Sequence, residues 1–501
     1  MNFLGLDVGT GGTRAVLIDE NGLVVASAAS EHAPFRSPYP GWAEQDPEDW
    51  WRAARTAIRE TLAAGAEVLT SRGDAASAIG AVGLTGQMHG AVLLDRDGKV
   101  LRPSLIWCDQ RTDAQCDWLH ERIGREHLIE LTCNPALPNF TLTKLLWVRD
   151  REPEVFARIA HVLCPKDYVR LRLTGTYAMD VQEASGTLLL DVTHRRWSSE
   201  VARIAGIDEA WLPQLFESPE VCAKISAEAA EVTGLVSGTP VVAGAGDQGA
   251  GAVGMGILQP GSVSATIGTS GVVFAATAVP TKDSLGRLHT FCHAVPGRWH
   301  VMGVTQAAGL SLRWLRDVVA PEASYDSLTA EAGRVPAGSD GLLWAPYLLG
   351  ERTPYLDSQA TAAFYGITAS HTRAHLVRAI LEGVAYSLKD TFTLFAELGI
   401  PIKSVRLGGG GARGPLWRSI QASIYGFPSD ILVAEEGAAF GAALLAGVGA
   451  GAWADTDAAC ATAIRVAEQI APDPAVQQTY ADGYKVYRRL YPALRSIRER
   501  L

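Results

Sequence analysis

A strand–turn–strand pattern occurs twice in this chain, at positions about 260 residues apart. The first copy places the glycine-rich turn Gly9–Gly12 between two apolar strands, and the second copy repeats that order around Gly268–Gly271. Two α/β domains therefore fit the pattern better than one continuous core, and a length of 501 residues agrees with two domains. Near Pro240 a new apolar strand leads into a glycine-dense stretch, as at the start of the chain. This predicts domains at residues 1–243 and 244–501.

The charge balance and the cysteines exclude several classes of protein. With 44 basic and 54 acidic residues the net charge is −10, which argues against a nucleic-acid partner. An anionic ligand would have to be held by local backbone N–H groups and a metal. The seven cysteines are scattered without a C-x-x-C pair, so we expect free thiols in a reducing compartment. The amino terminus has no basic region and no cleavable apolar segment, and no run approaches the length needed to span a bilayer, which predicts a cytoplasmic protein.

Asp7 stands at the end of the first strand, directly before the first turn. A carboxylate here can hold a magnesium ion through water, while the backbone N–H groups and Thr10 of the turn face phosphate oxygens. An ordinary hairpin turn also favours Gly and Asp, so this turn alone leaves both interpretations open. Its repetition at Gly268 and Thr269 favours two phosphate-binding hairpins that face each other across a cleft and hold a nucleotide.

The segment Gly244–Gly251 matches the pattern G-x-G-x-x-G, which is typical of dinucleotide-binding oxidoreductases. That fingerprint expects an acidic residue about 20 positions later, but no Asp or Glu occurs from Gln248 through Lys282. Asp247 fits another role, because a carboxylate beside glycines at a strand end can accept the proton of a hydroxyl that attacks phosphorus. Asp is also a favoured helix N-cap, and that alternative stays open.

Two clusters carry side chains suited to a polyol. Gln87 and His89 lie between glycines after a strand and can hydrogen-bond sugar hydroxyls, although a single His is more often structural. In the second cluster Trp107 can stack on the C–H face of a sugar, and Asp109 and Arg111 can bind hydroxyls. A surface ion pair would explain Asp109 and Arg111 equally well.

A run of four glycines at residues 408–411 follows an apolar strand and precedes a helical pattern. Such a backbone can lie flat against a planar ring or an α-phosphate, although a flexible linker has a similar composition. The flanking strand and helix favour a turn that binds a ligand. The chain contains no G-x-x-x-x-G-K-[ST], H-R-D or D-F-G motif, which excludes P-loop NTPases and eukaryotic-type protein kinases.

Taken in this order, the motifs resemble the FGGY family of carbohydrate kinases, and within it the xylulose kinases, over almost the whole chain. The second signature of the family matches residues 362–382, where Gly366-Ile367 is followed by His375-Leu376. The segment Gly86–Gly90 points to the xylulose kinases. Further matches to that group are Trp42–Pro47, Pro165–Tyr168 and Gly350–Pro354.

The resemblance implies an α/β fold with two ribonuclease-H-like domains, of the actin-like ATPase type, flanking a deep catalytic cleft. The implied reaction is phosphorylation of D-xylulose by ATP with Mg²⁺, the sugar held by the N-terminal domain and ATP by the C-terminal domain. Asp247 would be the catalytic base, and Asp7 would be associated with magnesium through water. The other implied residues are Met88 and His89 for the sugar, Thr10, Arg14, Gly268 and Thr269 for the phosphates, and Gly409, Gly410, Gly411 and Ala412 for the adenosine.

One residue departs from the xylulose kinase pattern. Gln248 follows the implied base, where those enzymes usually have Asn and glycerol kinases have Gln, so a related ketose or polyol stays open as the substrate. Two alternatives of other classes also stay open: an actin-like ATPase without sugar-kinase activity, and a non-catalytic sugar-sensing regulator. The expected partners are a small sugar and ATP, and the resemblance leaves a homodimer open.

Overall fold

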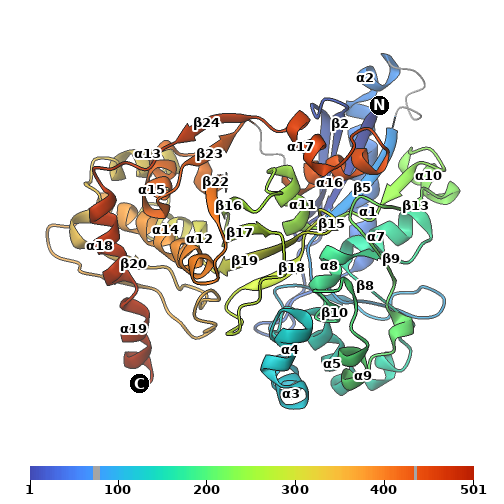
Figure 1. Ribbon diagram of the computed structural model, residues 1–501, viewed down its shortest axis with the longest axis horizontal. Helices are drawn as coiled ribbons and strands as arrows, with labels where there is room; N and C mark the ends of the chain where they lie inside the picture. The colour runs from blue at the N-terminus through green and yellow to red at the C-terminus, as the bar shows by residue number, and fades with distance from the viewer. Residues whose placement is uncertain (72–78, 434–436, 501) are drawn as a thin grey trace.

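A computed structural model describes residues 1–71, 79–433 and 437–500, which form two large mixed sheets with helices on both (Figure 1). The first sheet has the order β13-β14-β5-β1-β2-β3, with β15 also paired to β5. The second has the order β18-β19-β17-β16-β22-β23-β24. The strands of the first sheet are β1 (Asn2–Val8), β2 (Gly12–Asp19), β3 (Val24–Glu31), β5 (Ile79–Gly86), β13 (Val221–Lys224), β14 (Pro240–Val242) and β15 (Ala245–Gly246). Those of the second are β16 (Gly261–Ile267), β17 (Gly271–Thr277), β18 (His289–Cys292), β19 (Trp299–Thr305), β22 (Ile402–Gly409), β23 (Ser429–Leu432) and β24 (Val466–Ile470).

The two predicted hairpins occupy equivalent places in their sheets. β1 and β2 are antiparallel with Val8 opposite Thr13, and β16 and β17 are antiparallel with Ile267 opposite Gly271. Each first strand also has a parallel neighbour, β5 beside β1 and β22 beside β16. The glycine-rich turn therefore lies, in both sheets, at the edge where parallel strands end. The repeated pattern correctly predicted two domains of one α/β type.

Helix α16 (Gly437–Gly449) comes from the second half of the sequence but packs on the first sheet (Figure 1). Its small residues allow this close approach: a Cβ at Gly5 of β1 would lie 1.8 Å from the Ala439 carbonyl oxygen. On its other side α16 packs against α11 (Asp247–Gly254), where a Cβ at Gly441 would lie 1.8 Å from the Ala250 carbonyl oxygen. The chain thus returns to its first sheet near its end, and the boundary at 243/244 stays a prediction.

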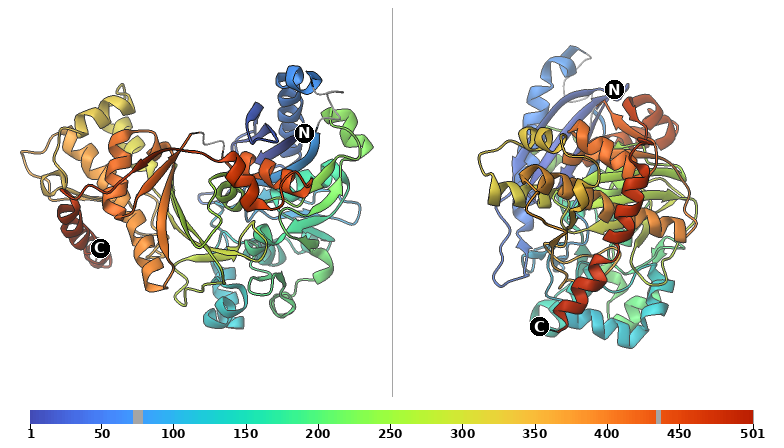
Figure 2. Two further views of the ribbon diagram at one scale, coloured as in Figure 1. Left: turned by 45° about the horizontal axis from the view of Figure 1, so that its top comes forward. Right: turned by 90° about the vertical axis from the view of Figure 1, so that its left-hand side faces the viewer.

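The remaining helices cover the sheets and build the outer parts of each half (Figure 2). Those of the first half are α1 (Pro47–Ala64), α2 (Ala66–Ser71), α3 (Asp113–Ile123), α4 (Arg125–Thr132), α5 (Thr141–Arg151), α6 (Pro153–Phe156), α7 (Pro165–Thr174), α8 (Val181–Ser185), α9 (Ser199–Ala205) and α10 (Ala227–Thr233). Those of the second half are α12 (Gly309–Val319), α13 (Tyr325–Ala332), α14 (Arg373–Glu397), α15 (Pro415–Tyr425), α18 (Gln477–Tyr487) and α19 (Leu490–Arg498). Helix α17 (Thr456–Ala463) packs instead beside α16 and α11 at the first sheet (Figure 1). No helix in the described ranges is long and apolar enough to cross a lipid bilayer.

Short strands complete the structure away from the two large sheets. They form the pairs β4 (Glu44–Gln45) with β7 (Ser104–Leu105), β6 (Val92–Leu94) with β8 (His161–Leu163), β9 (Ala178–Asp180) with β12 (Gln214–Phe216), β10 (Leu190–Asp191) with β11 (Arg196–Trp197), and β20 (Leu343–Ala345) with β21 (Ala363–Tyr365).

Candidate active site

Asp7 and Asp247 lie at the same edge of the first sheet, on either side of β5. In the parallel pairing Asp7 is opposite Thr85 of β5, and Ala245 of β15 is opposite the same residue from the other side. Asp247 follows β15 directly and is the first residue of α11. The sheet therefore brings together two carboxylates that are 240 positions apart in the sequence.

Both carboxyl groups hold their protons more tightly than usual. Burial raises the pKa of Asp7 to about 6, partly opposed by the charge of Arg14. Burial also raises the pKa of Asp247 to about 7, with a further contribution from the charge of Asp7, while hydrogen bonds from Gln248 oppose the shift. Because a general base works best when its pKa is near the working pH, Asp247 is suited to accept a proton.

The Asp7 side chain has a feature that fits a cation. Its Oδ1 atom is buried and has no hydrogen-bond partner in the described structure. Within the described ranges no three His, Cys, Asp or Glu side chains gather into a group that could hold a metal alone. A divalent cation at Asp7 would therefore complete its ligands with water and phosphate oxygens, as Mg²⁺ usually does.

Asp247 also faces a small cavity, of about 160 Å³, with walls from both halves of the molecule. Its lining residues are Asp247, Gln248, Gly251, Ala252, Gly254 and Met255 around α11, Ser264, Thr266, Val272 and Phe274 on β16 and β17, and Gly437 and Ala438 at the start of α16. Asp247 thus lies on a cavity shared by α11 and the strands of the second hairpin.

The first turn is tied to residues predicted for the sugar. Thr10 Oγ1 accepts a 2.9 Å hydrogen bond from the Trp107 indole nitrogen and lies 3.4 Å from Gln87 Oε1. Gln87 is buried, and its Nε2 donates to the Gly9 carbonyl at 3.2 Å and to Gln45 Oε1 at 2.8 Å. Both polar atoms of Gln87 are therefore used within the protein, where they hold the turn, while Trp107 is 37 % exposed.

His89 is held in one orientation and one tautomer. Its backbone is left-handed, with φ at 69°, and its Nδ1 lies 2.7 Å from the Gly186 carbonyl oxygen. A carbonyl can only accept, so Nδ1 carries the hydrogen. Burial lowers the pKa of His89 to about 3, so the ring is neutral and Nε2 is left as an acceptor, suited to a sugar hydroxyl. Met88 beside it is buried as well.

Asp109 lies in a buried ion pair and not at the surface. Both of its oxygens lie within 2.9 Å of the Arg111 guanidinium nitrogens, and Oδ2 accepts from the Ala43 backbone nitrogen at 2.6 Å. Arg111 in turn lies over the Trp42 ring, 3.6 Å from its centroid. Asp109 has no exposed surface, so a direct contact with sugar would require it to move.

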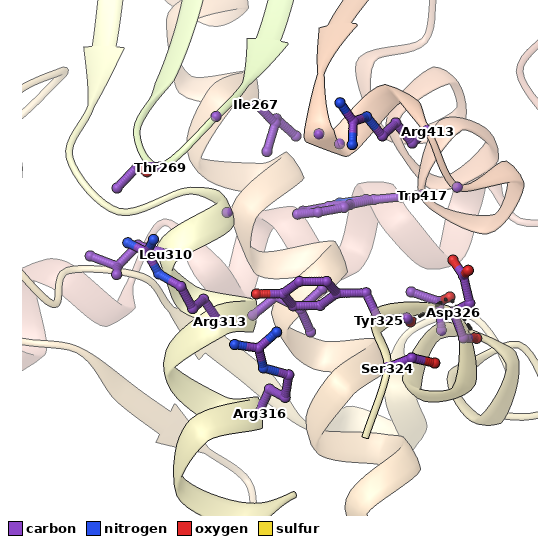
Figure 3. Close-up of a pocket in the computed structure, with 17 residues that line it drawn as sticks. Ile267, Thr269, Leu310, Arg313, Arg316, Ser324, Tyr325, Asp326, Arg413 and Trp417 are labelled. Carbon is purple, nitrogen blue, oxygen red and sulfur yellow. Dashed lines mark hydrogen bonds between the residues drawn. The ribbon is translucent and has the colours of Figure 1, made fainter. Parts of the chain in front are cut away.

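A large cavity, of about 800 Å³, opens beside the second hairpin and the glycine run (Figure 3). Gly268 and Thr269 line it from the hairpin, and Gly410 and Gly411 line it from the glycine run. The run is an ordered turn rather than a linker: Gly409 has φ at 72°, and a Cβ there would lie 2.6 Å from the Ile267 carbonyl oxygen.

Three residues of this cavity are not among the predicted site residues, although Trp417 lies in the helix that directly follows the glycine run. Trp417 of α15 and Tyr325 of α13 present their rings one above the other across the space, and Arg313 of α12 extends toward Leu310 near the hairpin (Figure 3). All three belong to ordinary amphipathic helices, so only the tertiary structure brings them together. A planar ring fits between two aromatic faces, and a guanidinium suits a phosphate.

Comparison with known proteins points to one family. The FGGY family of carbohydrate kinases matches with its N-terminal domain at residues 2–254 and its C-terminal domain at residues 263–450. The xylulose kinase of Bacillus subtilis is 38 % identical over 97 % of this chain and 96 % of its own length. That of Escherichia coli is 40 % identical over 89 % of this chain and 90 % of its own length. The crystal structure of xylulose kinase from Rhodospirillum rubrum, 34 % identical, superposes with a TM-score of 0.90 and covers 99 % of both chains. The chain therefore belongs to the FGGY family of carbohydrate kinases.

Proposed function

We propose that this carbohydrate kinase transfers the γ-phosphoryl group of ATP to the terminal hydroxyl of D-xylulose, giving D-xylulose 5-phosphate and ADP. The relatives named xylulose kinase match nearly the full chain and support this substrate. The observation that carries the proposal is the position of Asp247, on a cavity with walls from both halves of the molecule. That position suits a base between an alcohol and a nucleotide.

In this proposal the sugar binds to the first half of the molecule. A hydroxyl donates to His89 Nε2, the exposed ring of Trp107 stacks on the sugar, and Met88 packs against it. Gln248 lies beside Asp247 and contacts the hydroxyls near the reacting end. Gln87 and Asp109 act mainly through neighbours, since their polar atoms already bind Gly9, Gln45, Ala43 and Arg111.

The nucleotide occupies the large cavity of the second half. Its base lies between Trp417 and Tyr325, and the backbone of Gly410 and Gly411 faces the adenosine, whereas Gly409 and Ala412 do not line the cavity. Arg313 and the turn at Gly268 and Thr269 face the phosphates. Thr10 and Arg14 approach the phosphates from the first hairpin. Magnesium, which would be held by Asp7 through water, supplies charge neutralisation on the phosphates.

The Asp247 carboxylate removes the proton of the terminal hydroxyl while that oxygen forms a bond to the γ-phosphorus, and ADP leaves with the electrons of the broken P–O bond. A pKa near 7 lets Asp247 be ionised before the reaction and still hold the proton afterwards. The protein forms no covalent bond to the transferred phosphoryl group. The activation barrier is therefore lowered mainly by the alignment of the two substrates and by electrostatic stabilisation of the transition state.

A coupled ADP-release assay with Mg·ATP and a panel of D-xylulose, D-ribulose, a pentitol and glycerol tests the proposal. We expect the highest kcat/KM with D-xylulose. A higher value with another sugar would reassign the substrate within the family, and ADP release at the same rate without any sugar would indicate an actin-like ATPase. The cytoplasmic location and the homodimer remain predictions.

A further inference from the structure

Helix α8 (Val181–Ser185) contacts both the segment that leads to Asp247 and the residues proposed to line the sugar site. Gln182 has no exposed surface; its Oε1 accepts a 2.6 Å hydrogen bond from the backbone nitrogen of Gly246, and its Nε2 lies 3.7 Å from Met88 Sδ. Directly after the helix, the Gly186 carbonyl binds His89. One short helix therefore contacts both the residue before the proposed base and the residues of the proposed sugar pocket.

The Gln182 side chain has almost no freedom to move. A Cβ at Gly246 would lie 2.5 Å from Met88 Cγ and 2.9 Å from Gln182 Oε1. A Cβ at Gly249, in the first turn of α11, would lie 2.6 Å from Gln182 Cδ. The glycines on both sides of Asp247 thus allow the Gln182 amide to contact the backbone that carries the base.

A buried chain of charges anchors α8 to the other end of the same segment. Asp180 caps α8, and its Oδ2 lies 2.6 Å from Lys166 Nζ, which lies 2.6 Å from Asp167 Oδ1. Asp167 pairs with Arg170 at 2.6 Å, and Arg170 donates to the Ala243 carbonyl at 2.6 Å. All four charged side chains are fully buried. Residues 243–246 are therefore bound at one end by Arg170 and at the other by Gln182.

We propose that Gln182 is a positioning residue that fixes the Asp247 carboxylate relative to the acceptor hydroxyl and so couples ATP consumption to sugar phosphorylation. The inference rests on the proposed role of Asp247 as the base. The hydrogen bond to Gly246 holds the residue directly before Asp247, and the contact with Met88 ties it to the sugar pocket. If this link is lost, water can replace the misplaced hydroxyl, and ATP is hydrolysed to ADP and inorganic phosphate.

The test compares two substitutions at Gln182 with a control in the same helix. Gln182→Met keeps the length of the side chain but leaves the Gly246 N–H without an acceptor. We expect kcat with the best sugar of the panel to fall about 10- to 100-fold. The ratio of inorganic phosphate to sugar phosphate should rise, with little change in the sugar KM. Gln182→Glu keeps an acceptor oxygen and should restore most of the coupling.

Ser185→Ala is the matched control, because Ser185 lies in α8 but accepts from the Cys292 nitrogen at 3.0 Å and donates to the Val181 carbonyl at 2.7 Å. Its phosphate ratio should equal that of the wild type even if Tm falls. If Gln182→Met does not fold, Gln182→Asn replaces it, since Asn keeps the amide but is one methylene shorter.

A kcat within threefold of the wild type and an unchanged phosphate ratio in Gln182→Met, or in Gln182→Asn where it replaces Gln182→Met, would overturn the inference. A ratio that rises equally in Ser185→Ala would overturn it too, because the effect would then follow stability alone. Asp247→Asn, measured in parallel, separates the two proposals. Full activity in Asp247→Asn contradicts the role of Asp247 as the base. An inactive Asp247→Asn together with normal coupling in Gln182→Met contradicts only the inference.

Discussion

The indole nitrogen of Trp107 donates a 2.9 Å hydrogen bond to Thr10 Oγ1, and this bond joins a residue proposed for the sugar to a residue proposed for the phosphates. The same hydroxyl lies 3.4 Å from Gln87 Oε1. The two binding regions of the first half are therefore in direct contact, and a ligand that moves Trp107 also affects the phosphate hairpin.

Replacing Trp107 with Phe keeps an aromatic face but removes the hydrogen bond to Thr10. We expect the KM values for sugar and for ATP to rise together, by about two- to tenfold, because a net hydrogen bond contributes roughly 1 kcal/mol. A double-mutant cycle with Thr10→Val measures the link. Additive effects of the two substitutions would show that the two sides act independently.

Asp247→Asn should remove nearly all turnover, at least about a thousandfold, since general-base catalysis contributes about 10² to 10⁴ and correct orientation adds to it. The sugar affinity should stay within a few-fold, because Asn has the same shape. Steady-state kinetics and sugar binding by calorimetry measure the two quantities. Activity within a few-fold of the wild type would move the role of base to another residue.

The same substitution should stabilise the protein at alkaline pH. The pKa of Asp247 is raised in the folded protein, so between its ordinary value near 4 and about 7 the folded state binds more protons than the unfolded state. Stability is therefore lost as pH rises through that range, and the loss is complete above pH 7. Asn carries no charge, so we expect a gain of about 1 to 3 kcal/mol at pH 8 that disappears near pH 4. Urea unfolding at both values measures it.

The repeats and the local motifs predicted the fold because both hairpins are encoded by contiguous residues. The first turn with Asp7, and its counterpart at Gly268, could be recognised from glycine and strand pattern alone. The edge position of Asp247 also followed from the strand before it. These features depend on backbone geometry, which short sequences specify well.

Contacts between distant helices could not be predicted in the same way. Nothing in the sequence near Tyr325 marks a cavity, and Trp417, although it follows the glycine run, lies on an amphipathic helix, where an aromatic residue is usually part of the core. Gln87 and Asp109 illustrate the opposite case. Their residue types suit a sugar, but whether they face a ligand or a neighbouring side chain depends on Gln45, Ala43 and Arg111.

Tyr325→Ala should weaken ATP binding without changing the sugar site. Tyr325 is 39 % exposed and lines the large cavity, so its removal costs little stability but leaves one face of the base uncovered. We expect the KM for ATP to rise about 2- to 13-fold, because an aromatic pair contributes roughly 0.5 to 1.5 kcal/mol beyond the buried area. Tyr365→Ala, an exposed tyrosine outside the cavity, is the control. Equal ATP KM values in both variants would place the base elsewhere.

His300 should limit the stability of the protein in acid. Its ring stacks on Phe274 with centroids 4.1 Å apart, and neither ring nitrogen makes a well-aligned hydrogen bond in the described structure. A weak hydrogen bond with the Cys292 backbone opposes the effect of burial on the pKa of the ring. Burial lowers its pKa well below the usual value, so the folded state keeps the ring neutral. The unfolded chain binds a proton below about pH 6.5, so stability falls as the pH drops below that value.

His300→Phe keeps the stacked ring and removes both ring nitrogens, neither of which makes a well-aligned hydrogen bond in the described structure. The variant should therefore be more stable by about 1 to 3 kcal/mol at pH 7.5, the cost of a buried group without a partner. The difference should grow at pH 5.5, where the wild type loses stability through the protonation of its unfolded state. Urea unfolding at pH 7.5, 6.5 and 5.5 measures both effects, with the exposed residue His194, changed to Phe, as the control. If His300→Phe is less stable than the wild type, the His300 ring already has a good polar partner in the folded protein. If the difference in stability does not depend on pH, the burial of His300 carries no cost in acid.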